Sequence, residues 1–170
     1  CSGAGGKALH LCALSNNQAR IFAMDVDPKK LAALQSRAKR ARATEISPKP
    51  ITESTPSDFE NIADSLLIDS PCSGLGTLKR QPDLKWRLKP AALDRVRSIQ
   101  SQLLAEYPKM LKPGGKLLYA TCSILPSENQ DQIARFLEKR PGEYRLISQY
   151  NLLPSETGHD GFHASLLQKQ

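Results

Sequence analysis

The sequence predicts an α/β fold in which a mostly parallel sheet has helices on both faces. A strand-like apolar run followed by a helical pattern occurs three times along the chain. Two further strand candidates, YRLIS (144–148) and GFHASLLQ (161–168), close the chain, and their connection is too short for a crossover helix. We therefore expect them to pair antiparallel. The 170 residues suffice for one core, so residues 1–170 are expected to form a single domain.

The first strand and helix are expected in residues 19–41. ARIFAMD (19–25) is an apolar run that ends in an acid. Asp27 and Pro28 then supply an N-cap and a first-turn residue, which predict a helix through about Ala41.

The second strand is expected at ADSLLID (63–69), and its helix lies in residues 90–111. Between the first and second units, residues 43–61 are rich in proline and serine, and only a short strand around Ile51 is predicted there. The apolar residues of the second helix recur at helical spacing: Leu93, Val96, Ile99, Leu103 and Leu104.

The third strand, KLLYATCS (116–123), follows Gly114 and Gly115. Ser127 with Gln130 matches a capping box, which predicts the start of the next helix. The apolar positions of that helix include Ile133, Phe136 and Leu137.

Positive charge is concentrated in one part of the chain. The 24 Lys and Arg residues against 17 Asp and Glu give a net charge of +7. Residues 79–97 contain seven of these cations and two acids, a net +5. Such a stretch is typical of phosphate-backbone binding, although a solvated helix face would have the same composition.

Other classes of protein are disfavoured by composition. No apolar run approaches the length of a membrane span, so no membrane association is expected. The four cysteines match neither a disulfide framework nor a zinc-binding spacing, and the three histidines are scattered. We expect free thiols in a reducing compartment and no bound metal.

Residues 1–7, CSGAGGK, form a glycine-rich turn that enters a helix, which allows backbone N–H groups to approach a ligand. A purely structural tight turn is the alternative. The spacing fits neither the dinucleotide fingerprint nor the P-loop. Asp25, nineteen residues after Gly6, ends a strand where an acid can bind ribose hydroxyls. Together these features predict a nucleoside cofactor without a triphosphate.

Asp69 and Cys72 leave the second strand together, with Pro71 fixing the backbone between them. Cys122 ends the third strand, which would neighbour the second in a doubly wound sheet. Two thiols fifty residues apart are therefore expected to meet in one cleft. A small apolar thiol in a turn is the alternative interpretation of Cys72.

These residues resemble the Nop/Sun-type RNA cytosine-C5 methyltransferases, which use S-adenosylmethionine. CSGAGGK is similar to the loop C-A-A-P-G-G-K of that family, DSPCSGLG to D-A-P-C-S-x-x-G, and YATCSILPSEN to T-C-S-x-x-P-x-E-N. QPDLKW and HDGFHASLLQK look most similar to the bacterial Sun (RsmB) branch, whose substrate is a cytosine of 16S ribosomal RNA.

The resemblance implies a Rossmann-like S-adenosylmethionine-dependent methyltransferase fold. It assigns the nucleophile to Cys122, product release to Cys72 and stabilisation of the adduct to Asp69. It further implies a cytoplasmic monomer whose partner is small-subunit ribosomal RNA. The cofactor would be bound by Cys1, Ser2, Gly3, Ala4, Gly5, Gly6, Lys7, Asp25 and Asp69, and RNA phosphates by Lys79, Arg80, Lys85 and Arg87.

The chain also departs from the family pattern. Ala4 replaces the loop proline, and the Gly-Asp after the family's third strand has no clear counterpart, with Asp58 the only nearby acid. The family's first strand and any upstream RNA-binding domain are expected to be missing. A scaffold protein that has lost cofactor affinity is therefore an alternative, whereas methylation of an exocyclic amine would need no thiol. Trp86 is expected to be a packing anchor, with base stacking as the alternative.

Overall fold

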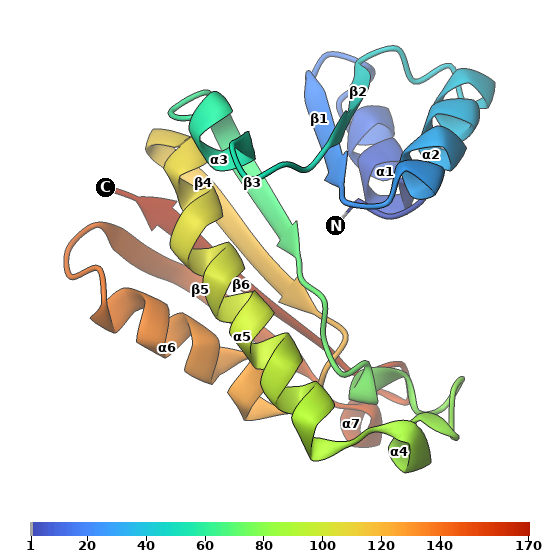
Figure 1. Cartoon of the computed structure of the whole chain (residues 1–170), viewed down its shortest axis with the longest axis vertical. Coiled ribbons are helices and arrows are strands. Elements are labelled where there is room, and N and C mark those ends of the chain that lie inside the picture. Colours follow the sequence, from blue (N-terminus) through green and yellow to red (C-terminus); the bar gives the residue numbers. More distant parts are fainter. Residues whose placement is uncertain (1) are drawn as a thin grey trace. The chain divides into compact units, whose positions relative to one another are not determined.

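The computed structural model describes residues 2–170, apart from the side chain of Thr157. The chain consists of two compact units, Cys1–Thr55 and Pro56–Gln170. Each unit has its own sheet and its own hydrophobic core (Figure 1). The expected single domain over residues 1–170 stays a prediction. Within the described residues, no helix is long and apolar enough to span a membrane.

The first unit contains two helices and a two-stranded parallel sheet. The elements are α1 (Gly6–Leu14), β1 (Ile21–Asp25), α2 (Pro28–Arg40) and β2 (Ile46–Pro50). Asp27 is the N-cap of α2, and its side chain accepts a hydrogen bond from the Lys29 backbone N–H at 2.9 Å. The predicted strand and helix in residues 19–41 are therefore confirmed. Side chains of all four elements form the core: Ala8, Cys12, Ala23, Leu34, Ala38 and Ile46.

Strand β2 lies earlier in the chain than the short strand predicted around Ile51, and it contains Pro48 and Pro50. The prediction placed it wrongly because prolines normally argue against a strand. Among residues 2–170, β1 is the only strand paired with β2. The Ile51 N–H donates to Asp25 O at 3.0 Å, so by alternation the proline nitrogens face away from β1, where no donor is needed.

The second unit is built on a four-stranded sheet with the order β3-β4-β6-β5. Strands β3 and β4 are parallel, whereas β6 is antiparallel to both β4 and β5. The predicted antiparallel C-terminal pair is confirmed. The elements are α3 (Thr55–Asp58), β3 (Ala63–Asp69), the 3-10 turn η1 (Leu75–Thr77), α4 (Leu84–Arg87), α5 (Pro90–Glu106), η2 (Tyr107–Met110), β4 (Leu111–Thr121), η3 (Pro126–Glu128), α6 (Gln130–Glu138), β5 (Tyr144–Leu152), α7 (Pro154–Thr157) and β6 (Phe162–Lys169).

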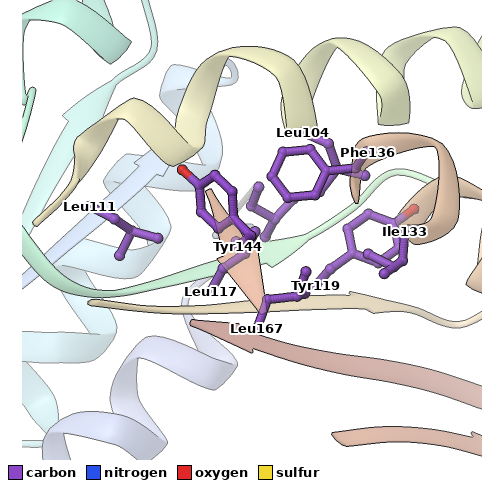
Figure 2. Close-up of a cluster of buried hydrophobic side chains, with 9 residues drawn as sticks. Leu104, Leu111, Leu117, Tyr119, Ile133, Phe136, Tyr144 and Leu167 are labelled. Carbon is purple, nitrogen blue, oxygen red and sulfur yellow. The ribbon is translucent and has the colours of Figure 1, made fainter. Parts of the chain in front are cut away.

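Helices α5 and α6 cover one face of this sheet (Figure 1). Figure 2 shows Leu104 of α5 and Phe136 of α6 packed over the strands. Leu117 of β4 and Leu167 of β6 are fully buried below them. Each such aliphatic side chain contributes about 1.5–3 kcal/mol when it leaves water. This core fixes β4 beside β3, which positions the loops that follow both strands.

The start of α6 differs from the prediction. The expected capping box of Ser127 and Gln130 does not form, because Pro126–Glu128 make a 3-10 turn and the helix begins at Gln130 with Asn129 as its N-cap. The Asn129 side chain does not cap the helix either. It accepts from Thr121 Oγ1 at 2.6 Å and thereby ties the helix start to the end of β4.

Candidate functional site

The two predicted thiols meet at the carboxyl ends of β3 and β4. Asp69 pairs in register with Ala120, and the Ser70 N–H donates to Ala120 O at 2.9 Å. Strands β3 and β4 therefore end at the same edge of the sheet. The Sγ atoms of Cys72 and Cys122 are 3.3 Å apart. The predicted meeting of these half-buried thiols is confirmed, whereas their chemical roles stay predictions.

The surroundings of Cys72 favour its protonated form. Its hydrogen bond with Cys122, followed by burial and the charge of a Cys122 thiolate, raises the pKa of the Cys72 thiol well above its ordinary value. Cys72 therefore keeps its proton at neutral pH. A thiol that keeps its proton can donate a hydrogen bond to a neighbouring thiolate.

Asp69 is the last residue of β3 and is half-buried. It precedes Cys72 by three residues, on the segment that carries the thiol out of the sheet. The amide of Gln100, on α5, donates to Pro71 O at 2.9 Å and holds this segment. The structure thus places Asp69 at the strand end where the sequence predicted it.

A buried polar network behind the thiols was not predicted. The Glu128 carboxylate accepts from the Ser73 backbone N–H at 2.8 Å and from the Ser73 hydroxyl at 2.6 Å. The Ser73 and Ser123 hydroxyl oxygens are 3.2 Å apart. All three residues are buried, and two of them directly follow the cysteines. The only available signal was the pair of Cys-Ser dipeptides within the two motifs.

The loop after Cys72 is tied to the segment before β6. Gly76 N donates to Cys122 O at 2.9 Å, and Gly161 N donates to Gly76 O at 2.7 Å. A Cβ at Gly76 would overlap the Gly161 carbonyl oxygen, so only glycine allows this close approach. Arg80 adds an ion pair with Asp160, in which Nη2 and Oδ2 are 2.6 Å apart.

The predicted RNA-binding cations are exposed, and most have partners within the chain. Lys79 Nζ donates to Gly158 O at 2.9 Å, and Arg87 pairs with Asp83 at 2.9 Å. Their side chains remain on the surface, so the positive stretch is available to a polyanion. RNA binding by these residues stays a prediction.

Trp86 is not a packing anchor, contrary to the expectation. It is 81% exposed on the one-turn helix α4, and the Lys85 Nζ lies 5.1 Å from its ring centroid. The neighbouring Leu84 points inward instead, toward Gly74. Leu84 is half-buried, whereas the other three residues of α4 are exposed. Base stacking by Trp86 stays a prediction.

In the first unit, the glycine-rich loop lies at the N-terminus of α1. Cys1 is outside the described residues. Ser2 N donates to Met24 O at 2.8 Å, which fixes the loop beside β1. Gly5 is the N-cap with a φ of 85°, and a Cβ there would overlap the Leu34 side chain. The loop conformation therefore requires glycine at this position.

Asp25 closes this loop. Its carboxylate accepts from the Gly3 N–H at 2.8 Å and from the Asp27 N–H at 3.0 Å. Burial raises the pKa of the Asp25 carboxyl, but these backbone hydrogen bonds together with nearby positive charge, including that of Lys30, lower it overall. Asp25 is therefore an ionised acceptor, and carboxylate oxygens with remaining lone pairs suit ribose hydroxyls.

The loop fits a nucleoside ligand. The Ser2 hydroxyl oxygen is buried and has no hydrogen-bond partner within residues 2–170, which leaves a polar group for a ligand to satisfy. Gly3 and Gly6 have open space where a Cβ would lie. Ala4 and Lys7 are exposed, and Ala4 O accepts from Arg37 Nη1 at 2.6 Å. Asp58, the acid considered as a counterpart of the family's Gly-Asp, is exposed at the end of α3.

Metal-ligating clusters are not part of either site. Across the described part of the chain, no three His, Cys, Asp or Glu side chains gather in a way that could hold a metal ion. Within residues 2–170, Cys12, Cys72 and Cys122 form no disulfide.

Comparisons with known proteins agree with these sites. The family model described as 16S rRNA methyltransferase RsmB/F matches residues 1–168. The chain belongs to this family. A relative in Erwinia tasmaniensis, ribosomal RNA small subunit methyltransferase B, is 36% identical over 100% of this chain and 41% of its own length.

Solved structures of similar proteins confirm the predicted methyltransferase fold class. PH0851 is 32% identical, with a TM-score of 0.92 over 98% of this chain and 41% of that one. NSun6 from Pyrococcus horikoshii, solved with SFG, is 22% identical, with a TM-score of 0.88 over 99% of this chain and 46% of that one. The RsmB/F chain described here thus spans about two-fifths of the length of the curated relative and of PH0851.

Proposed function

We propose that this chain carries the catalytic site of an S-adenosylmethionine-dependent RNA (cytosine-C5)-methyltransferase that acts on 16S ribosomal RNA. Membership of the RsmB/F family supports the rRNA substrate and the methyl transfer. The observation that carries the cytosine C5 chemistry is the 3.3 Å approach of the Cys72 and Cys122 sulfurs at adjacent strand ends. Methylation of an exocyclic amine would use no thiol.

Cys122 acts as the nucleophile in this proposal. Cytosine C5 is a poor nucleophile until a thiolate adds to C6, which forms a C6–S bond and moves the electron pair of the C5–C6 double bond into an enamine. Asp69 holds the N3 edge of the base, where negative charge develops during addition. The bound cofactor supplies the methyl group.

Cys72 acts after methyl transfer. The C5 proton passes to solvent water, the electron pair of the C5–H bond restores the C5–C6 double bond, and the electron pair of the C6–S bond returns to Cys122. The hydrogen bond with Cys122 and burial keep Cys72 protonated in the resting protein. Its S–H can therefore stabilise the Cys122 thiolate as it departs from C6.

The glycine-rich loop would hold the cofactor. Ser2, Gly3 and Gly6 present a free hydroxyl and open backbone, and Asp25 presents its carboxylate to ribose. A calorimetric titration with S-adenosylmethionine tests this site. We expect micromolar binding that Asp25→Ala abolishes, whereas Glu138→Ala, which removes an exposed acid on α6, leaves it unchanged.

Adduct trapping tests the thiol chemistry. Incubation of Cys72→Ser with S-adenosylmethionine and a small-subunit rRNA transcript should accumulate an RNA–protein adduct that survives denaturing electrophoresis. Cys72→Ser/Cys122→Ser should form none, and an adduct that survives the second substitution would refute Cys122 as the nucleophile. RNA binding without cofactor binding or adduct would instead favour the scaffold alternative.

A further inference from the structure

Glu128 is a fully buried carboxylate without a cationic partner. Its exposed fraction is 0%, and it takes part in none of the ion pairs among residues 2–170. A buried charge without a counter-charge is costly, so hydrogen bonds must offset its desolvation. The side chain is therefore retained against an energetic penalty, and its hydrogen-bond partners indicate what it does.

Those partners lie on both sides of Cys72. Oε1 accepts from the Ser73 backbone N–H at 2.8 Å, and Oε2 accepts from the Ser73 hydroxyl at 2.6 Å. Gln100 Nε2 lies 3.5 Å from Oε1 and donates to Pro71 O at 2.9 Å. The residues before and after Cys72 are thus held by one pair of buried side chains, Gln100 and Glu128.

The network continues to the second thiol. Because the Ser73 hydroxyl donates its proton to Glu128, the Ser123 hydroxyl must be the donor across the 3.2 Å contact between the two serine oxygens. Ser123 directly follows Cys122, and its oxygen accepts from Leu125 N at 3.1 Å. The direction of donation therefore runs from Ser123 to Ser73 to Glu128.

We infer that Glu128 is a positioning residue that sets the separation of the Cys72 and Cys122 thiols. It acts through Ser73, whose hydroxyl holds Ser123 in turn. A carboxylate is required because Ser73 presents two donors, and an amide offers only one acceptor. With Glu128→Gln, the Ser73 hydroxyl must either reverse, so that it donates to Ser123, or leave one donor unpaired, and either change removes the donation from Ser123 through Ser73 to Glu128.

A trivalent arsenical measures this separation without RNA or cofactor. Phenylarsine oxide condenses with two thiols to form two As–S bonds and release one water, and it binds tightly only where both sulfurs are close together. Mass spectrometry of the folded chain locates the bridged cysteines and gives the apparent Kd. We expect Glu128→Gln and Ser73→Ala each to weaken bridging of Cys72 and Cys122 at least tenfold.

A double-mutant cycle tests the route through Ser73. Glu128→Gln/Ser73→Ala should bind the arsenical no more weakly than either single variant. Ser165→Ala, which removes a buried hydroxyl on β6, is the matched control and should bind like the parent. Circular dichroism checks that each variant is folded, and Ser73→Ala carries the test if Glu128→Gln does not fold.

Undiminished bridging in a folded Glu128→Gln or Ser73→Ala variant would overturn the inference, and additive losses would overturn the route through Ser73. The positioning role bears on catalysis only through the proposed function, but the arsenical measurement does not depend on it. Failure to trap an adduct with intact bridging would sink the methyltransferase chemistry and leave the positioning role in place.

Discussion

The burial of His163 predicts that the folded protein loses measurable stability in mild acid. The side chain is fully buried on β6, where Nδ1 is 2.7 Å from Asn151 Oδ1 and Nε2 is 2.8 Å from Ser165 Oγ. Because the amide oxygen can only accept, Nδ1 carries the proton and Nε2 accepts from the serine hydroxyl. Burial lowers the pKa of His163 to about 4 from its ordinary 6.5.

The sign and size of the effect follow from linkage. The unfolded chain takes up a proton near pH 6.5, whereas folded His163 stays neutral until about pH 4. Neutral His163 therefore costs the folded state nothing above pH 6.5, and the stability of the fold decreases as the pH falls from 6.5 toward 4. At pH 5, which is 1.5 units below the unfolded pKa, the unfolded chain has protonated His163 and the folded chain has not. At 1.36 kcal/mol per unit, this difference lowers the free energy of unfolding by about 2 kcal/mol.

Urea denaturation of the parent chain and His163→Gln at pH 7.5 and pH 5.0 measures this quantity. Glutamine can accept from Ser165 but does not titrate, and all other titrating groups cancel in the comparison. The stability of the parent relative to His163→Gln should fall by about 2 kcal/mol between the two pH values. Equal pH dependences of the two proteins would refute the assignment of a buried neutral His163.

Three further substitutions have defined outcomes. Gly5→Ala should destabilise the chain by about 2 kcal/mol or more, because strain at positive φ adds to overlap with a core leucine, whereas Gly6→Ala should be nearly neutral in the same thermal melt. Trp86→Ala should weaken single-stranded RNA binding by about 1–3 kcal/mol if a base stacks on it, and Trp86→Phe should restore most of the loss in a filter-binding assay. Asp160→Asn should free Arg80 for phosphate and steepen the log–log salt dependence of RNA binding by about 0.7, and an unchanged slope would show that the ion pair with Asp160 does not withhold Arg80 from phosphate.

Local and topological signals were sufficient for much of the fold. Asp27 and Pro28 determine the start of α2 through short-range geometry, which a sequence displays directly. The meeting of Cys72 and Cys122 was predictable because parallel neighbouring strands end at one edge of a sheet. Where local signals competed, the prediction failed: Pro126 starts a 3-10 turn that removes Ser127 from the helix start.

Exposure was harder to predict than strand order. Trp86 stands between two leucines in the sequence, yet α4 is one turn long, and Leu84 is half-buried while Trp86 is exposed. Periodicity decides which side chains are buried only when a helix is long enough to have an inward and an outward face. The burial of Glu128 was missed for a different reason. An acid in a polar turn gives no sign of burial until its distant partners are known.

The two cysteine motifs are better understood as one structural unit than as two separate sites. In DSPCSGLG and TCSILPSEN, each cysteine is followed by a serine, and these serines contact each other at 3.2 Å. The acid of the second motif, Glu128, binds both donors of the serine in the first. A substitution at Ser73 or Glu128 therefore acts on both thiols at once. The placement of both cysteines therefore depends on a contact between Ser73 and Glu128, 55 positions apart, which neither motif reveals when it is considered alone.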